Sequence, residues 1–245
     1  GPGERHIKAA KAGQLARFED SGFDTSLAAS GEWVFSAEKD IALRTEPRNA
    51  QGQVDSCGRC HARRGTLGAY RHGEDLLATH QLLLPRPPLY HLDGQVLDEN
   101  FVYGSFVQSK MFNAGVVCSD CHEPHSQTLR SPGNGVCAQC HQVKQYDTPA
   151  HHHHLPESSG ALCANCHMPE TTYMVVDPRR DHSLRIPRPD LSLTTGTPNA
   201  CTGCHTNKDA QWAVNSLDAW GVALPEAASA MVRALQQVEQ GEDKV

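Results

Sequence analysis

The hydrophobic positions along the chain predict short helices separated by long polar segments. Apolar residues recur every three or four positions, the spacing of one helix face, in several stretches. The predicted helices span residues 5–20, 74–83, 99–113, 208–219 and 225–239. The last two are joined by a turn that ends at Pro225, a residue suited to a first helical position. We therefore expect the chain to close with an αα-hairpin.

Little else in the chain shows a clear period. Apolar residues within 31–44 indicate a short strand or hairpin. The run Pro-Arg-Pro-Pro at 85–88 breaks the chain, because proline lacks the amide hydrogen that regular structure needs. These patterns together predict a mainly α fold with much irregular loop.

Ten cysteines change this picture, because all of them fall in one repeated pattern, C-x-x-C-H. The five motifs, numbered 1 to 5 in chain order, are Cys57/Cys60/His61, Cys118/Cys121/His122, Cys137/Cys140/His141, Cys163/Cys166/His167 and Cys201/Cys204/His205. Cysteines at i and i+3 lie about one helical turn apart, which presents two sulfurs for the thioether bonds of haem c. The next residue is carried beneath the ring, where its imidazole binds the iron as the proximal ligand. We predict five haem c groups and a multihaem cytochrome c fold organised around stacked haems.

A zinc ribbon is the main alternative use of these cysteines. Between Cys121 and Cys137 lie 15 residues, a spacing that fits such ribbons. Ribbons use CxxC units in pairs, however, and five units leave one without a partner. Zinc also gives no reason for a histidine after every second cysteine. A thioredoxin-like site would need one CxxC near a βαβ pattern, which the sequence does not show.

Composition and charge agree with a core built partly of porphyrin. Aromatic residues make up only 6% of the 245 residues, and haem faces can replace them. The formal net charge is −6, and ionised haem propionates make it more negative. This balance favours a positively charged partner surface and argues against nucleic acid. No apolar run approaches the roughly 18 residues of a membrane span.

Histidines outside the motifs are candidate distal iron ligands, and the sequence holds more of them than five irons need. The candidates are His80, His91, His125, His151, His154 and His182. His125 follows His122 too closely to reach the same iron, so it would bind an adjacent one. In a helix, His151 and His154 share one face and can both be ligands.

The remaining candidates are weaker. His80 and His91 bracket the proline break, and one of them is expected to bind iron. His72, beside Gly73, is expected to be an ordinary exposed histidine. Met168 and Met174 could give histidine–methionine ligation, although a methionine in the core is the commoner outcome.

The chain resembles the multihaem c-type cytochromes that carry C-terminal tetratricopeptide repeats. The similar segments are 103–111 (YGSFVQSKM), 118–126 (CSDCHEPHS), 146–150 with the histidine run, 166–169 (CHMP), 181–190 (DHSLRIPRPD) and 196–201 (GTPNAC). In such proteins the CHxPH and HxxH elements supply distal ligands to neighbouring haems. The resemblance thus implies this role for His125, His151, His154 and His182.

The first residues, Gly1-Pro2-Gly3-Glu4-Arg5-His6, are similar to a segment that in this family follows directly on a CxxCH motif. The resemblance therefore implies a piece of a longer protein, without its N-terminal haems and its C-terminal repeats. His6 would then bind a haem outside this chain. An N-terminal Gly-Pro is also typical of an expression scar. Within the chain we predict three units: 1–50 with a helix and a short strand segment, a pentahaem core over 51–206, and the αα-hairpin over 207–245.

Electron transfer through mostly bis-histidine haems is the function that these features favour. Imidazole on both faces of an iron leaves no open position, so such a centre can only change oxidation state. The first alternative is an oxidoreductase acting on a small nitrogen or sulfur compound at one five-coordinate haem, for which motif 1 is the best candidate. Residues that could assist there are Arg179, Arg180, Arg185, Arg188, Tyr173 and Asp181, and propionate pairing is the commoner role of such arginines.

A second alternative is a subunit of a cytochrome filament, with haem ligation or stacking across subunits. The expected partners are redox proteins or further haem domains, and a homo-oligomer would fit the filament hypothesis. Covalent haem attachment takes place outside the cytoplasm, so we expect a periplasmic or extracellular location with an export signal outside this segment.

Overall fold

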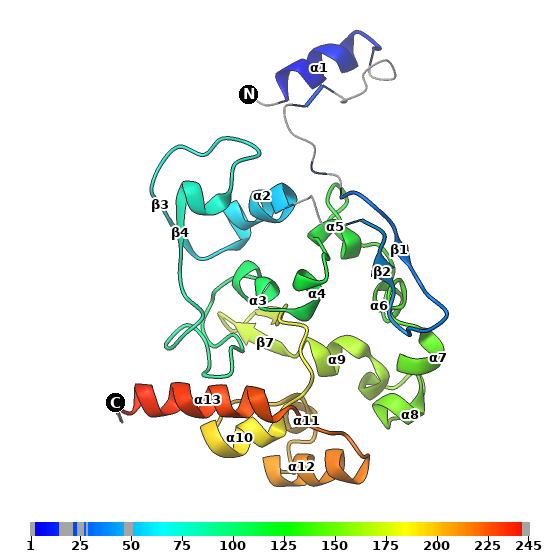
Figure 1. Ribbon diagram of the computed structural model, residues 1–245, viewed down its shortest axis with the longest axis vertical. Helices are drawn as coiled ribbons and strands as arrows, with labels where there is room; N and C mark the ends of the chain where they lie inside the picture. The colour runs from blue at the N-terminus through cyan, green and yellow to red at the C-terminus, as the bar shows by residue number, and fades with distance from the viewer. Residues whose placement is uncertain (1–2, 15–21, 24–26, 28, 47–50, 242–245) are drawn as a thin grey trace.

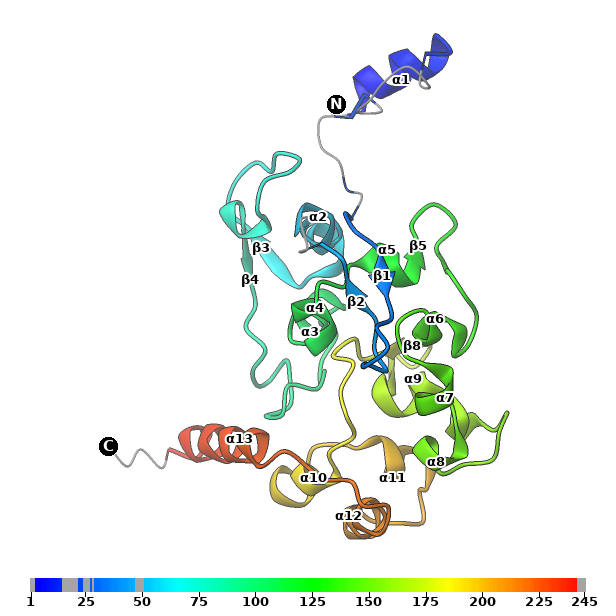
Figure 2. The same ribbon diagram turned by 45° about the vertical axis from the view of Figure 1, so that its right-hand side comes forward.

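The CxxCH motifs lie on short helices that follow one another through the fold. The computed structural model describes residues 3–14, 22–23, 27, 29–46 and 51–241. The motif helices are α2 (Gln51–His61), α5 (Cys118–Cys121), α6 (Gly135–Ala138), α9 (Cys163–His167) and α11 (Ala200–Cys204). In Figure 2 the last four descend from α5 to α11, with α2 beside α5. The chain therefore presents its motifs in sequence order.

Small hairpins and further short helices surround the motif helices (Figure 1). The hairpins are β1 (Trp33–Val34) with β2 (Leu43–Arg44), β3 (Arg64–Thr66) with β4 (His80–Leu82), β5 (His122–Glu123) with β6 (Thr128–Leu129), and β7 (Glu170–Tyr173) with β8 (Asp177–Arg180), all antiparallel. The other helices are α1 (Glu4–Lys11), η2 (Leu76–Ala78), α3 (Tyr103–Val107), α4 (Lys110–Asn113), α7 (Val143–Tyr146), α8 (Pro149–His152), η3 (Ser159–Ala161), α10 (Pro189–Thr195), α12 (Ala210–Ala219) and α13 (Glu226–Glu239). The fold is mainly helical with much loop, as the sequence predicted.

The side-chain core is small and lies around motif 1. Val54 on α2, Leu76 on η2 and Val117, just before α5, are almost fully buried and belong to one hydrophobic cluster. The carboxylate of Asp55 is buried with them and accepts hydrogen bonds from the Tyr103 hydroxyl (3.1 Å) and the Leu76 amide (3.3 Å). Elsewhere many large apolar side chains are exposed.

The N-terminal hairpin predicted over 31–44 forms and lies across motifs 2 and 3. The Arg44 guanidinium donates to both carboxylate oxygens of Asp120, at 2.8 and 3.0 Å. Next to it the Ala42 amide donates to the Cys140 carbonyl (2.8 Å), and the Gln142 backbone amide donates to the Asp40 backbone carbonyl (2.9 Å). The hairpin thus fixes two motif segments relative to each other.

The C-terminal helices α12 and α13 form within the predicted ranges, but each packs mainly against α10 and not against the other, as the expected αα-hairpin would. Arg188, before α10, donates to Asp190 and to the Ser229 hydroxyl of α13, each at 2.6 Å. The Gln236 side chain donates to the Thr194 carbonyl at 3.1 Å. Pro225 lies at the N-cap of α13, one position before the expected one. The two helices are therefore anchored on the segment that leads into motif 5.

Three predicted helices differ from the structure. Within 74–83 only η2 is helical, because residues 80–82 pair as β4 with β3, and this tertiary pairing overrides local propensity. The segment 99–113 holds two helices, α3 and α4, since the Ser109 side chain caps a new helix by accepting from the Phe112 amide. In the segment 5–20 the helix α1 ends at Lys11, and residues 15–20 lie outside the described residues.

Among the described helices, none has the length and apolar character to cross a membrane.

Candidate haem c centres

Thiols of successive motifs contact one another in two places. The Cys57 thiol is hydrogen-bonded to Cys118, which lowers the pKa of Cys57 to about 7 and raises that of Cys118. Cys137 and Cys163 share a second such bond, which lowers the pKa of Cys137 and raises that of Cys163. None of these cysteines forms a disulfide. Motifs 1 and 2, and motifs 3 and 4, therefore stand side by side through their cysteines.

The second thiol of motif 1 differs from the first, although the sequence assigned both to one haem on equal terms. Cys60 is exposed, as is Cys204, whereas the other eight cysteines are half-buried. The buried face of α2 carries Val54 and Gly58, and at about 100° per residue Cys60 points to the opposite side of the helix. Of the two thiols, Cys57 is the one that contacts the next motif. The assignment of Cys60 as a thioether site therefore rests on the CxxCH spacing and stays a prediction.

Weaker links connect the motif pairs into one series. The pKa of Cys121 is raised to about 11 by burial and then by Asp120 and Cys140, which places motif 2 beside motif 3. The Gln139 side chain donates to the Asp120 carbonyl at 3.2 Å across the same junction. Burial and the neighbouring Cys201 and Cys204 raise the pKa of Cys166, which places motif 4 beside motif 5.

Three motif histidines face a histidine from elsewhere in the chain across a gap of the right size for iron. The ring centroids of His122 and His182 are 6.3 Å apart, with the planes at 23°. Those of His167 and His151 are 6.2 Å apart at 14°, and those of His205 and His154 are 6.0 Å apart at 33°. A metal–imidazole bond is about 2 Å long and a centroid lies about 1.1 Å behind its nitrogen, so two imidazoles on one iron have centroids about 6.2 Å apart. The residues present therefore fit bis-histidine haem at motifs 2, 4 and 5.

Backbone carbonyls orient one imidazole of each pair. The Nδ1 atom of His182 donates to the Arg180 carbonyl and that of His167 to the Arg185 carbonyl, each at 2.9 Å. The Nδ1 atom of His154 donates to the carbonyl of His152. A carbonyl only accepts, so Nδ1 carries the proton and the lone pair lies on Nε2, where a metal would bind. Burial also lowers the pKa of His182, which keeps the imidazole neutral.

The histidine run does not present His151 and His154 on one helix face, and that expectation was wrong. The helix α8 ends at His152, and His153 adopts a left-handed backbone conformation with φ of 55°. This turn reverses the chain, so that His151 faces motif 4 and His154 faces motif 5. Residues 151–154 therefore direct one imidazole toward each of two motifs, and we call this segment the fork.

The other distal candidates lie away from the motif histidines. His80 is 5% exposed, with its Nδ1 atom 2.9 Å from the Thr79 hydroxyl and its ring edge-on to Tyr70. His91 is half-buried, and burial lowers its pKa. The side chain of His125 is 94% exposed and pairs with Glu123, while His6 stacks on Phe23. In the described part of the chain, no ring contact joins any of these to His61 or His141.

Two arginines in and next to motif 1 have donor nitrogens that could bind a carboxylate. The Nε atoms of Arg59, inside the motif, and Arg64, on β3, are buried without a hydrogen-bond partner. The Arg59 guanidinium lies 3.8 Å above the Tyr70 ring. Haem propionates are anionic groups of the kind that arginine binds. These orphaned donors are a second observation that fits haem.

The arginines proposed for an enzyme site are occupied by protein groups. Arg179 pairs with Asp177 (2.6 Å) and Glu99 (2.9 Å), Arg185 with Asp93 (3.2 Å) and Arg188 with Asp190 (2.6 Å). Arg180 donates to the carbonyls of Ala164 and Met168 in the motif 4 segment, at 3.1 Å each. Protein carboxylates and carbonyls thus take most of the donors that we expected propionates or a substrate to bind. The Nη1 atom of Arg179 and the Tyr173 hydroxyl are buried without a hydrogen-bond partner.

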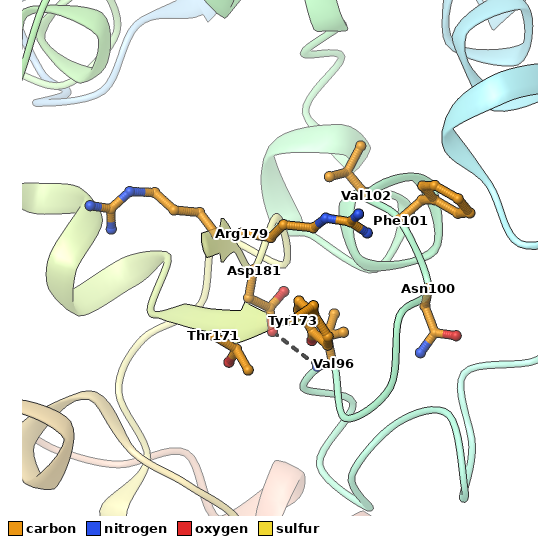
Figure 3. Close-up of a pocket in the computed structure, with 9 residues that line it drawn as sticks. Val96, Asn100, Phe101, Val102, Thr171, Tyr173, Arg179 and Asp181 are labelled. Atoms are coloured by element: carbon orange, nitrogen blue, oxygen red, sulfur yellow. Dashed lines mark hydrogen bonds between the residues drawn. The ribbon is translucent and has the colours of Figure 1, made fainter. Parts of the chain in front are cut away.

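A small pocket lies beside Arg179, between β7–β8 and the segment before α3 (Figure 3). Tyr173 and Asp181 line it, and Asp181 accepts a hydrogen bond from the Val96 amide at 3.2 Å. Burial, followed by the Asp181 carboxylate, raises the pKa of Tyr173. The described residues hold no cluster of three or more histidine, cysteine or acidic side chains placed to bind a metal ion.

Comparisons with known proteins agree with this geometry. Residues 110–146, which contain motifs 2 and 3, match the family model described as a doubled CXXCH motif. A search of curated proteins found no match. The fold is similar to the crystal structure of the outer cell wall cytochrome OcwA, with a TM-score of 0.54 and 17% identity over 71% of this chain. The match spans 53% of OcwA, about half its length. The chain thus has CxxCH haem c motifs in a fold like that of a multihaem cytochrome.

Proposed function

We propose that the chain is an electron-transfer unit with haem c at each of its five motifs, mostly bis-histidine ligated. The three imidazole pairs carry this proposal, because each leaves a gap of the size that one iron fills. Haem c supplies a one-electron iron centre. Closed coordination keeps substrates away from the metal, so the residues that bind it restrict the centre to electron exchange.

The proposed ligand pairs are His122 with His182, His167 with His151, and His205 with His154. For motif 1 we propose His80, because it is buried on the hairpin that follows the motif and its ring meets Tyr70, which in turn lies under Arg59. His91 and His125 are proposed as distal ligands for motif 3 or for irons of neighbouring molecules, and His6 for a haem outside this chain. The exposure of the His125 side chain supports binding to an iron of a neighbouring molecule.

The order of the motifs supports transfer along a series. Contacts between cysteines link motif 1 to 2 and 3 to 4, and buried junctions link 2 to 3 and 4 to 5. A continuous row of this kind needs a donor at one end and an acceptor at the other. We therefore propose redox proteins or further haem domains as partners, in the periplasm or outside the cell, and a family relationship to the cytochromes with tetratricopeptide repeats.

Motif 1 is the place where the enzyme alternative is most specific, because His61 is exposed and stacks on no histidine ring among the described residues. Its imidazole is nevertheless near enough to His122 and His182 to contribute to their lowered pKa values. A five-coordinate iron at motif 1 would be high-spin. Arg179 pairs with two carboxylates through Nη2, which leaves only its buried Nη1 for an anion. The filament alternative rests on the exposed His125 and would appear as ordered polymers.

The test is to produce the 245-residue chain in the periplasm of a bacterium with a c-type cytochrome maturation system. Intact mass under denaturing conditions counts covalent haems, and low-temperature EPR reports their spin state. We expect five haems, all or nearly all low-spin. A Cys201→Ala/Cys204→Ala variant should lose the mass of one haem, and so should a Cys57→Ala/Cys60→Ala variant. Absence of covalent haem, or a mainly high-spin spectrum at neutral pH, would refute the proposal.

A further inference from the structure

One side chain of the histidine run is stacked on the C-terminal helical segment. The rings of His153 and Trp220 are parallel to within 7°, with centroids 4.0 Å apart. Trp220 caps α12, whereas His153 stands between the two fork residues that face motifs 4 and 5. The stack therefore joins the fork to an element that supplies no CxxCH motif.

The fork needs such support because of its backbone. A non-glycine residue with φ of 55° occupies the left-handed region, which is sterically unfavourable for an L-residue. Surrounding contacts must hold this conformation. The His153 side chain has one ring contact to do so, with Trp220. If that contact were lost, the turn that points His151 and His154 in different directions would relax.

The opposite side of the fork is held by close packing. A Cβ atom at Gly160 would lie 2.1 Å from Cδ2 of His154, so the backbone there approaches the imidazole directly. His154 is thus confined between Gly160 on one side and a turn fixed by Trp220 on the other.

The same helix reaches the other ligand of motif 5. Asp209 caps α12 by accepting from the Trp212 amide (2.8 Å), and the Trp212 ring lies 4.9 Å from the ring of His205. Trp212 and Trp220 are eight positions apart, about 12 Å along a helix. One helix therefore contacts the proximal histidine of motif 5 at its start and the fork at its end.

We propose that Trp220 and His153 form a clamp that positions the distal imidazoles of motifs 4 and 5. Trp220 is a positioning residue, because it acts on the ligands through His153 and does not itself reach an iron. His153 is not a ligand in this proposal. Through the clamp, α12 helps to hold the proposed distal ligands of motifs 4 and 5 in place. This inference rests on the proposed function, since it requires iron at these motifs.

The test compares Trp220→Leu with Trp220→Phe in the haem-loaded chain. Leucine removes the flat surface and phenylalanine restores it. We expect Trp220→Leu to keep the full number of covalent haems but to change the EPR signals of the haems at motifs 4 and 5 to high-spin or altered low-spin signals. It should also shift the potentials of these two haems in a redox titration, and Trp220→Phe should resemble the parent protein. Val222→Ala is the matched control, because Val222 and Trp220 are both 39% exposed and lie in the same turn.

His153→Phe separates the clamp from direct ligation. Phenylalanine stacks but cannot bind iron, so the clamp predicts a parent-like spectrum, whereas loss of a low-spin haem would show that His153 is itself a ligand and would overturn the proposal. Unchanged spectra and potentials in Trp220→Leu would overturn it as well. Failure of the proposed function would appear differently, as a parent protein that lacks covalent or low-spin haem before any substitution.

Discussion

Arg44 of the N-terminal hairpin and Asp120 inside the second CxxCH motif form a two-point ion pair, with the Arg44 side chain only 4% exposed. Asp120 also accepts a hydrogen bond from the Val117 amide at 2.8 Å and so caps the motif helix. Its carboxylate therefore joins the β1–β2 hairpin to the start of the α5 motif helix. The pair is a structural support for motif 2.

We expect Asp120→Asn to destabilise the protein by about 2–4 kcal/mol, because it leaves a buried guanidinium without its counter-ion. Denaturant unfolding of the haem-loaded chain, followed by circular dichroism, measures this. Asp98→Asn is the matched control, since Asp98 pairs with Arg63 at the surface, with side chains 53% and 42% exposed. Its effect should stay below about 1 kcal/mol. Equal losses in both variants would contradict a special role for the buried pair.

The residues of the CxxCH motifs show what the sequence could and could not predict. The thiols and histidines of the CxxCH motifs could be identified from the sequence directly, because the motif places them within five consecutive residues. Spacing does not reveal their surroundings, however, and so it did not separate the exposed Cys60 from Cys57. The partner of His122 could not be read either, since His182 reaches it through the packing of β8 and the loop after it. Sequence reasoning did select His182 as a ligand candidate, but spacing alone assigns it to no particular motif.

Local pattern failed where tertiary contacts decide the backbone. His80 lies in a segment with helical spacing, yet pairing with Thr66 makes it part of a strand. His153 adopts a left-handed conformation that nothing in four consecutive histidines signals. Asp120 and Trp220 were missed altogether, because a carboxylate or an indole acquires its role here from a partner far away in the chain.

Replacement of a distal histidine should expose one iron. We expect His182→Ala to retain all covalent haems and to convert one of them to high-spin, because His122 then has no imidazole opposite it. Added imidazole should restore the low-spin signal in EPR and optical spectra. His72→Ala, at an exposed position, should leave the spectra unchanged. A fully low-spin His182→Ala protein without added imidazole would show that His182 is not a ligand.

Gly160 offers a steric test of His154 as a ligand. Gly160→Ala should push the imidazole away from motif 5, because the new Cβ atom would lie within 2.1 Å of its ring. We expect a change in the spin state or potential of one haem, measured by EPR and redox titration. Gly203→Ala within motif 5 is the control, since a Cβ atom there meets nothing within 4 Å and a helical alanine is favoured over glycine by about 1 kcal/mol. Parent-like spectra for Gly160→Ala would mean that His154 does not bind the iron.

Acid should weaken the attachment of α13 through Asp190. Burial raises the pKa of this carboxyl, but the hydrogen bond and charge of Arg188 outweigh it, and the net pKa is lowered. A carboxylate with a depressed folded-state pKa contributes stability above its unfolded pKa, near 3.9, and loses that contribution as the pH falls through the folded-state pKa. The free energy of unfolding, measured between about pH 2 and pH 6, should therefore fall more steeply below pH 4 for the parent protein than for Asp190→Asn. Glu239→Gln, an exposed change on the same helix, should leave the parent's slope intact. A pH profile of Asp190→Asn that matches the parent's would show that the Arg188–Asp190–Ser229 contact does not couple α13 to pH.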